Sequence, residues 1–277
     1  MTIPYWLTSS TSEIEQVSRT QAGAVYFGND TILCRVLGKY LLYGDTTDVG
    51  ITPHLALNGF WESWITLAIA RAVQPGWHCL DVGANHGYYT LVMADGAGAS
   101  GAVIAIEPNP DPAARLAHTI DVNGIGSTTR LVPHAASDAV GERVELFIAE
   151  NRGMNASLGE RAAGSRAVTV ETTTVDELVS GWPRTDLVKI DVEGAEESVW
   201  RGMSRTLDEN PELLVILEVN SRRYADPAAF YEQIRAAGFA LRYIDFDGEI
   251  RPITVDRLVE ERRGEDWMLF LQRDATL

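Results

Sequence analysis

The sequence has little of what a disulfide scaffold or a membrane protein needs. It contains two cysteines in 277 residues, and Cys79 lies in an apolar stretch, so a disulfide framework is not expected. No apolar run reaches the roughly 20 residues that span a bilayer. The first residues, MTIPYWLTSSTSE, lack the basic and apolar segments of a signal peptide. We therefore expect a cytoplasmic protein with no membrane contact.

Basic residues are also scarce. The chain has 23 Lys and Arg against 39 Asp and Glu, which gives a formal net charge of −16. Nucleic-acid binding depends mainly on Lys and Arg contacts to phosphate groups, so no nucleic-acid partner is expected. A chain of this length can bury one full hydrophobic core.

Apolar runs of strand length alternate with helical patterns through most of the chain. We expect helices at 59–73, 111–123, 195–208 and 228–237, and strands at 79–82, 102–107, 129–134, 142–150, 167–174, 186–192 and 213–219. This alternation indicates an α/β protein with a mainly parallel sheet covered by helices on both faces. Residues 1–58 read as an N-terminal extension with short strands and a possible lid, and 59–277 as the main domain.

The stretch 78–91, HCLDVGANHGYYTL, reads as a buried strand, a tight turn and the start of a helix. Gly83 lets the chain reverse, and Gly87 allows a close approach to a ligand. Such a turn exposes N–H groups at the positive end of a helix dipole. The dinucleotide fingerprint G-x-G-x-x-G is not met, because Asn85 replaces its middle glycine. We interpret the stretch as the cofactor site.

Glu107 ends the next strand, 20 residues beyond Gly87. An acid in this place can accept hydrogen bonds from both hydroxyls of a ribose. Alternatively, it is an acid that precedes the helix starting near Asn109. A ribose with free hydroxyls occurs in nicotinamide cofactors as well as in S-adenosylmethionine, so Glu107 alone does not separate them.

Three separated segments together resemble a known family. PGWHCLDVGANHGYYT (75–90), IEPNP (106–110) and DLVKIDVEGAEESVWRGM (186–203) resemble the FkbM family of methyltransferases. The resemblance implies a class I methyltransferase Rossmann-like fold, with a mostly parallel seven-stranded sheet whose last strand is antiparallel. It also implies S-adenosylmethionine as cofactor and, most often, methyl transfer to a hydroxyl of a small molecule or sugar.

The resemblance implies roles for single residues as well. The residues expected to hold the methionine end of the donor lie in the glycine turn: Asp81, Gly83, Asn85 and Gly87. Tyr88, at the helix start, is a further candidate for cofactor binding. Glu107 would bind the ribose, and Ser137 would lie beside the adenine. Glu62 either favours its helix as a first-turn acid or faces the cofactor.

Several polar residues should meet at the carboxyl edge of the sheet, where ligands bind. Asp191 and Glu193 follow one strand, and Glu218 and Asn220 end the next. Close carboxylates repel, so a raised pKa, a cation or a basic substrate should compensate. A carboxylate with a raised pKa could deprotonate an acceptor hydroxyl. Alternatively, Asp191, Glu218 and Asn220 could bind Mg²⁺, which we do not favour, and Glu193 could be a first-turn helix acid.

The catalytic candidates are therefore Asp191, Glu193 and His86. Asp191 is also expected to touch the cofactor, and His86 could face the acceptor or could simply be solvated. The main hypothesis is an S-adenosylmethionine-dependent O-methyltransferase acting on a small-molecule or sugar hydroxyl, with a carboxylate acceptor left open. The alternatives are a nicotinamide-dependent oxidoreductase and a catalytically silent binding module.

The acceptor itself is not identified by the sequence. Its walls are expected from the N-terminal 60 residues and the segment 151–166, which lie outside the recognisable motifs. The strand-rich extension could also pair across a homodimer.

Overall fold

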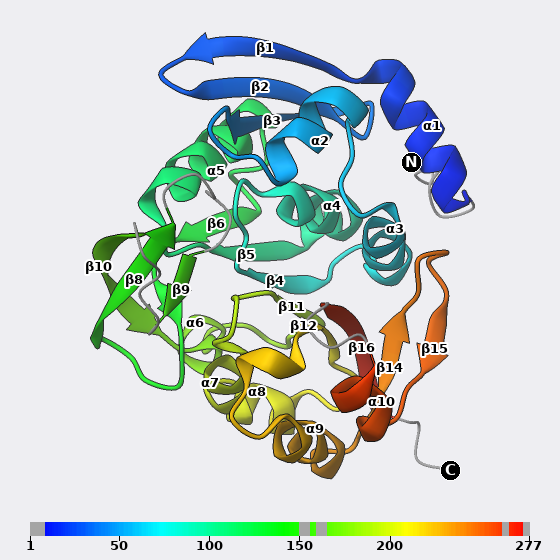
Figure 1. The fold of residues 1–277 in the computed structure, drawn as a ribbon, viewed down its shortest axis with the longest axis vertical. Coiled ribbons are helices and arrows are strands. Elements are labelled where there is room, and N and C mark those ends of the chain that lie inside the picture. The colour runs from blue at the N-terminus through cyan, green and yellow to red at the C-terminus, as the bar shows by residue number, and fades with distance from the viewer. Residues whose placement is uncertain (1–8, 150–155, 159–164, 262–265, 274–277) are drawn as a thin grey trace.

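A twisted, mostly parallel sheet forms the centre of the protein (Figure 1). The computed structural model describes residues 9–149, 156–158, 165–261 and 266–273. The parallel strands are β4 (His78–Val82), β5 (Ala102–Ile106), β6 (Thr129–Val132), β11 (Leu187–Ile190) and β12 (Leu214–Val219). The strand order is β15–β14–β16–β12–β11–β4–β5–β6.

The last strand reverses the direction of the sheet. β16 (Trp267–Arg273) runs antiparallel to both β12 and β14 (Arg242–Ile244), between which it lies. The expected parallel sheet with an antiparallel last strand is therefore confirmed. Two short strands, β13 (Phe239–Ala240) and β15 (Ile250–Pro252), extend the expected seven strands to nine.

Strand alternation assigns each sheet residue to one of two helical layers. In β4, Leu80 and Val82 join the core cluster formed with α7 (Glu196–Arg201), α8 (Ser204–Glu209) and α9 (Pro227–Ala236). Cys79 joins the opposite cluster, with α3 (Ser63–Ala72) and α4 (Tyr88–Ala97). Asp81 and Lys189 lie at positions that alternate onto this second face, so they are directed toward α4.

One of the expected helices is divided in two, and another is shorter than expected. The helix expected at 195–208 is split into α7 and α8 at Gly202, where a Cβ atom would lie 1.9 Å from the carbonyl oxygen of Ser137. The segment 59–73 is helical only from Ser63, because Gly59 closes the preceding α2 (Ile51–Asn58) with a left-handed φ of 72°. Close packing and backbone conformation thus override the helical sequence pattern.

The N-terminal extension is more ordered than the sequence indicates. It contains α1 (Thr11–Gln21), started by a capping box between Ser10 and Glu13, and a sheet of β1 (Gly23–Gly28), β2 (Thr31–Val36) and β3 (Tyr40–Asp45). Leu42 and Leu55 belong to the same core cluster as α3 and α4. The extension therefore packs continuously onto the main body, and its treatment as a separate unit, 1–58, stays a prediction.

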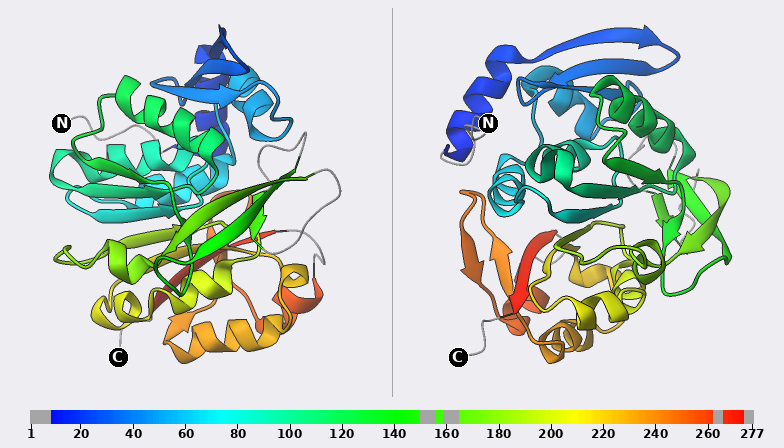
Figure 2. Two further views of the ribbon diagram at one scale, coloured as in Figure 1. Left: turned by 90° about the vertical axis from the view of Figure 1, so that its left-hand side faces the viewer. Right: turned by 180° about the vertical axis from the view of Figure 1, so that it is seen from behind.

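A second small sheet lies beside the central one, across the front of the left view of Figure 2. Its strands are β7 (Ala135–Ala136), β10 (Ser165–Thr173), β8 (Arg143–Ala149) and β9 (Ala156–Leu158), in that order. Most of the segment 151–166, expected to form a substrate wall, lies outside the described residues. The remaining helices are α5 (Pro110–Val122), α6 (Val175–Leu178) and α10 (Val255–Glu260). None of the helices within the described ranges has the length and apolar content needed to cross a bilayer.

Candidate active site

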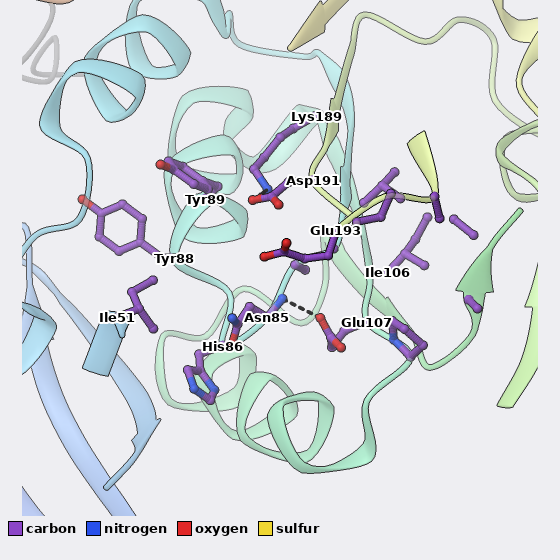
Figure 3. A pocket seen from close by; sticks show the side chains of 18 of the residues that line it. Ile51, Asn85, His86, Tyr88, Tyr89, Ile106, Glu107, Lys189, Asp191 and Glu193 are labelled. Atoms are coloured by element: carbon purple, nitrogen blue, oxygen red, sulfur yellow. Dashed lines mark hydrogen bonds and ion pairs between the residues drawn. The ribbon is translucent and has the colours of Figure 1, made fainter. Parts of the chain in front are cut away.

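A cavity opens at the carboxyl ends of β4, β5 and β11 (Figure 3). This is the place where the strand order reverses, since the chain moves from β4 outward to β6 and then returns to the other side of β4 with β11. The cavity has about 950 Å³ of empty space, including solvent at its mouth.

The glycine turn forms one wall, and packing within the protein fixes its conformation. Gly83 has a φ of +77°, and a Cβ atom there would lie 1.8 Å from the carbonyl oxygen of Asp191. Gly87 has a φ of +92°, and a Cβ atom there would lie 2.4 Å from a methyl carbon of Leu116. We expected Gly87 to approach a ligand, but the close contact is with α5.

Most backbone N–H groups of the turn are used internally. Those of Gly83 and Ala84 donate to the carbonyl of Ile106 at 2.9 and 3.0 Å, and that of Gly87 donates to Ala84 at 2.8 Å. The N–H of Asn85 donates to Glu107. Four of the N–H groups that we expected to be exposed are thus bonded within the protein, and the binding of a ligand at the turn stays a prediction.

Glu107 joins the end of β5 to this turn. Its Oε2 accepts the N–H of Asn85 at 2.8 Å (dashed in Figure 3), and its Oε1 accepts the N–H of Asn109 at 2.8 Å. Burial raises the pKa of Glu107 to about 7, although both N–H donors lower it. Each oxygen keeps a further lone pair for a ligand hydroxyl.

Asn85 adds an unsatisfied acceptor to the same wall. The residue lines the cavity, and in the described part of the chain its buried Oδ1 has no hydrogen-bond partner. Because orphaned buried acceptors are rare, this atom is a natural partner for a ligand donor.

The opposite wall contains a buried lysine that our sequence interpretation missed. The Nζ of Lys189 lies 3.2 Å from Oδ2 of Asp191 and 3.6 Å from Oδ1 of Asp81. Burial lowers the pKa of Lys189, but Asp191, Asp81 and Glu218 together raise it above its ordinary value. The signal was present in the sequence, because a lysine in an apolar strand two residues before Asp191 must share its face.

Asp81 lies behind the cavity wall and contacts Lys189, which lines the cavity. Its side chain is fully buried, is not among the residues lining the cavity, and accepts the hydroxyl of Thr90 at 2.6 Å. Burial raises its pKa, and Lys189 acts in the opposite direction. Asp81 therefore reaches the cavity only through Lys189, and its predicted contact with the donor stays a prediction.

Tyr88 and Tyr89 bring α4 to the cavity wall. The hydroxyl of Tyr89 donates to Glu62 at 2.6 Å, and the hydroxyls of Tyr88 and Thr66 lie 3.0 Å apart. Glu62 precedes α3 with a φ of +35° and makes no capping hydrogen bond. It is therefore not a first-turn acid, and burial raises its pKa to about 7. Trp61 also lines the cavity.

The predicted acids do meet at the edge of the sheet. Carboxylate oxygens of Asp191, Glu193 and Glu218 lie within 4.8 Å of one another. Arg223 supplies a compensating cation, since it lies 2.7 Å from Glu193 and 2.9 Å from Glu218. Burial still raises the pKa of Glu193 to about 7, and burial and Asp191 raise that of Glu218 well above its ordinary value.

Asn220 is occupied by other partners. Its amide donates to Asp266 at 2.9 Å, and its oxygen accepts the N–H of Arg222 at 3.1 Å. Two of the proposed metal ligands, Asp191 and Glu218, thus lie together, while Asn220 is held in a local turn. The magnesium site stays an untested alternative that we do not favour.

His86 and Ser137 are placed less favourably for their predicted roles. His86 lines the cavity wall but points away from Asp191 and Glu193 in Figure 3, and burial lowers its pKa to about 4. The hydroxyl of Ser137 donates to Asp138 at 3.2 Å, and its neighbours Ala135 and Ala136 line the cavity in its place.

The sheet order, the inserted antiparallel strand and the glycine turn at the strand reversal define a class I methyltransferase fold. The profile described as the methyltransferase FkbM domain matches residues 81–245, and the chain belongs to this family. The family assignment selects the methyltransferase hypothesis over the nicotinamide-dependent one.

Single relatives are more distant. Hexuronic acid methyltransferase AglP of Haloferax volcanii is 30% identical over 129 residues, which are 46% of this chain and 50% of that protein. The match thus spans about half the length of that relative. A methyltransferase FkbM from Methylobacillus flagellatus has a TM-score of 0.43 at 14% identity, covering 79% of this chain and 52% of that one. A putative rRNA methylase from Clostridium thermocellum has a TM-score of 0.49 at 8% identity, covering 77% and 95%.

Proposed function

We propose that the protein transfers the methyl group of S-adenosylmethionine to a hydroxyl of a small molecule, with a sugar as the favoured acceptor. One observation carries this proposal. A single cavity is lined by the glycine turn and Glu107 on one side and by Asp191 and Glu193 on the other. The groups that we propose for donor binding and the candidate proton acceptors therefore line the same cavity.

The residues present fit the donor. The carboxylate of Glu107 can accept the two ribose hydroxyls, and the orphaned Oδ1 of Asn85 can accept a hydrogen bond from the ammonium group of the methionine end. Asp191 lies at the end of the neighbouring strand and provides negative charge toward a sulfonium. When bound, the donor supplies an electrophilic methyl group, so the protein has to align the acceptor and remove its proton.

Glu193 is the best-placed proton acceptor. It lines the cavity, and its pKa of about 7 suits a general base near neutral pH. Asp191 is held by Lys189 in an ion pair and is better suited to orient the acceptor hydroxyl. Arg223 restrains the Glu193 side chain without removing it from the cavity wall.

Two observations support a sugar as the acceptor: the negative charge of the protein and the name of its Haloferax relative. The rim carboxylates and the net charge of −16 disfavour a nucleic acid. The Haloferax relative is named for a hexuronic acid, which offers both hydroxyls and a carboxylate. A sugar hydroxyl is our first choice, and a sugar carboxylate is the second.

An assay with isotopically methyl-labelled donor tests the proposal. Incubation with neutral sugars, hexuronic acids and amino sugars should give a labelled product with at least one class. A methyl ester loses its label in mild base, whereas a methyl ether keeps it, so the same assay separates the two acceptor groups. Donor binding without turnover of any acceptor would instead favour the silent module. A parallel assay with EDTA tests whether turnover needs a divalent cation.

A further inference from the structure

The outer edge of the N-terminal sheet is not used by the active site. Strand β1 is the edge strand of the order β1–β2–β3, and in the described ranges it pairs with β2 only. Figure 1 shows it at one end of the molecule, away from the central sheet. Its outer side therefore presents backbone N–H and C=O groups that can pair with another strand.

The side chains of β1 are apolar and open on both faces. Val25, Tyr26 and Phe27 are 62%, 63% and 62% exposed. Because successive side chains of a strand alternate between its faces, neither face of β1 is fully covered. The strand GAVYFG contains no charge and no proline, which are the common devices that protect an edge. A register shift between Tyr26 and Gly28 affects only the hairpin end.

The opposite edge of the same sheet is protected. On β3, the N–H of Leu41 donates to Asn123 at 3.1 Å, and that of Tyr43 donates to Thr119 at 3.1 Å. Asn123 also donates to the carbonyl of Leu41 at 2.6 Å. Helix α5 thus covers β3 with polar side chains, whereas β1 has no such cover among the described residues.

We propose that β1 pairs with β1 of a second copy, antiparallel across a two-fold axis, so that two three-stranded sheets become one of six strands. A two-fold contact joins the same patch on both subunits and must therefore be self-complementary. An uncharged strand meets this condition, because it brings no like charges together although each copy carries −16. It offers no ionic contact to a charged partner, which favours a second copy.

The available area is consistent with a reversible dimer. An aromatic side chain buries about 150–250 Å², so Tyr26 and Phe27, with the exposed fractions given above, each leave roughly 90–160 Å² to cover. Val25 adds to this, as does Leu57, which is 77% exposed on α2, a helix that packs against β1. Two copies would bury on the order of 1,000 Å², near the lower limit of specific interfaces. We therefore expect a dimer that dissociates on dilution.

Light scattering on the full chain tests whether a dimer forms, and hydrogen exchange tests whether β1 takes part in it. The mass should rise from one chain toward two as the concentration increases to about 100 µM, and amide exchange in β1 should slow over the same range. Val25→Lys should keep the protein monomeric at all these concentrations. Val140→Lys is the matched control, because Val140 is 57% exposed and lies outside the N-terminal sheet.

The outcomes are distinct. A monomer at every concentration overturns the proposal, whether or not β1 is protected by another part of the same chain. A dimer that survives Val25→Lys, or that forms without slower exchange in β1, also overturns it. Equal melting temperatures for the two lysine variants ensure that loss of the dimer is not loss of the fold.

Discussion

Oε2 of Glu107 accepts the backbone N–H of Asn85 at 2.8 Å, so the acid at the end of β5 holds the glycine turn at the end of β4. The same carboxylate that is expected to bind the ribose therefore also shapes the turn that is expected to bind the methionine end. Donor recognition and local structure are coupled through one side chain, and the predictions below separate the two.

Replacing Glu107 by Gln should weaken S-adenosylhomocysteine binding by about 10-fold or more, because hydrogen bonds to a charged acceptor are worth about 1.5–3 kcal/mol. Glutamine has nearly the same shape, but its amide oxygen can accept only one of the two backbone N–H groups that Glu107 binds, so the melting temperature should also change, and affinities are compared at a temperature where both variants are folded. Titration calorimetry measures the effect. Asp111→Asn, in the first turn of the adjoining α5, is the control and should bind normally. If both variants bound S-adenosylhomocysteine with equal affinity, Glu107 would not be a donor-binding residue.

The free energy of unfolding should decrease as the pH rises from the ordinary pKa of Glu107 to its pKa in the folded protein. Burial raises its pKa from 4.5 to about 7, so between these values the folded state holds a proton that the unfolded chain has released. The free energy of unfolding should drop by up to ~3 kcal/mol from this group alone. Urea unfolding at pH 5 to 8 should show a steeper decline for wild type than for Glu107→Gln. Parallel curves would contradict the assignment.

The two acids at the end of β11 should differ in their effects. Glu193→Gln should lower kcat by about 10²–10⁴-fold, the usual contribution of a general base, with donor affinity unchanged. Asp191→Asn should also slow turnover much more than it weakens donor binding. Glu197→Gln, on the following helix and away from the cavity wall, is the control. An equal loss of turnover and donor affinity in Asp191→Asn would exclude it from the catalytic step.

The chain has only two lysines, which gives a matched pair of variants. Lys189→Met should cost about 3–5 kcal/mol of stability, because it leaves the buried Asp81 without its cation. Lys39→Met should change stability by less than about 0.5 kcal/mol, because that side chain is 55% exposed. Denaturant unfolding measures both. The cost at Lys189 should shrink in acid, where Asp81 is protonated, and a cost that does not depend on pH would contradict this explanation.

Gly83→Ala should be far more disruptive than Gly124→Ala. Both glycines have a positive φ, +77° and +67°, but only at Gly83 would a Cβ atom collide with backbone, 1.8 Å from the carbonyl oxygen of Asp191. The control at Gly124 should cost only the roughly 1–2 kcal/mol of the left-handed conformation. Melting temperatures report the difference. A similar cost at both positions would show that the turn and β11 can separate easily.

Local patterns were sufficient for much of this architecture. The alternation of apolar runs and helical segments predicted the parallel sheet, and the spacing of Gly87 and Glu107 placed both at the same sheet edge. Asp191, Glu193 and Glu218 were predicted to meet because neighbouring parallel strands end together.

Contacts that depend on three-dimensional packing were not predictable in this way. Arg223 lies in a polar stretch that gives no sign of its three carboxylate partners, Glu193, Glu218 and Asp266. The approach of Leu116 to Gly87 depends on how α5 crosses the turn, and strand periodicity does not encode it. Lys189 was predictable in part. The alternation of side chains along β11 determines which face of the sheet Lys189 lies on, but only the register between β11 and β4 identifies Asp81 as its partner.

Calorimetric titration of the wild-type protein with S-adenosylhomocysteine tests the central claim most directly, namely that the glycine turn and Glu107 bind one adenosyl ligand in the cavity. We predict saturable binding of one ligand per chain, with no comparable heat from NAD. Binding of NAD without binding of S-adenosylhomocysteine would contradict the account.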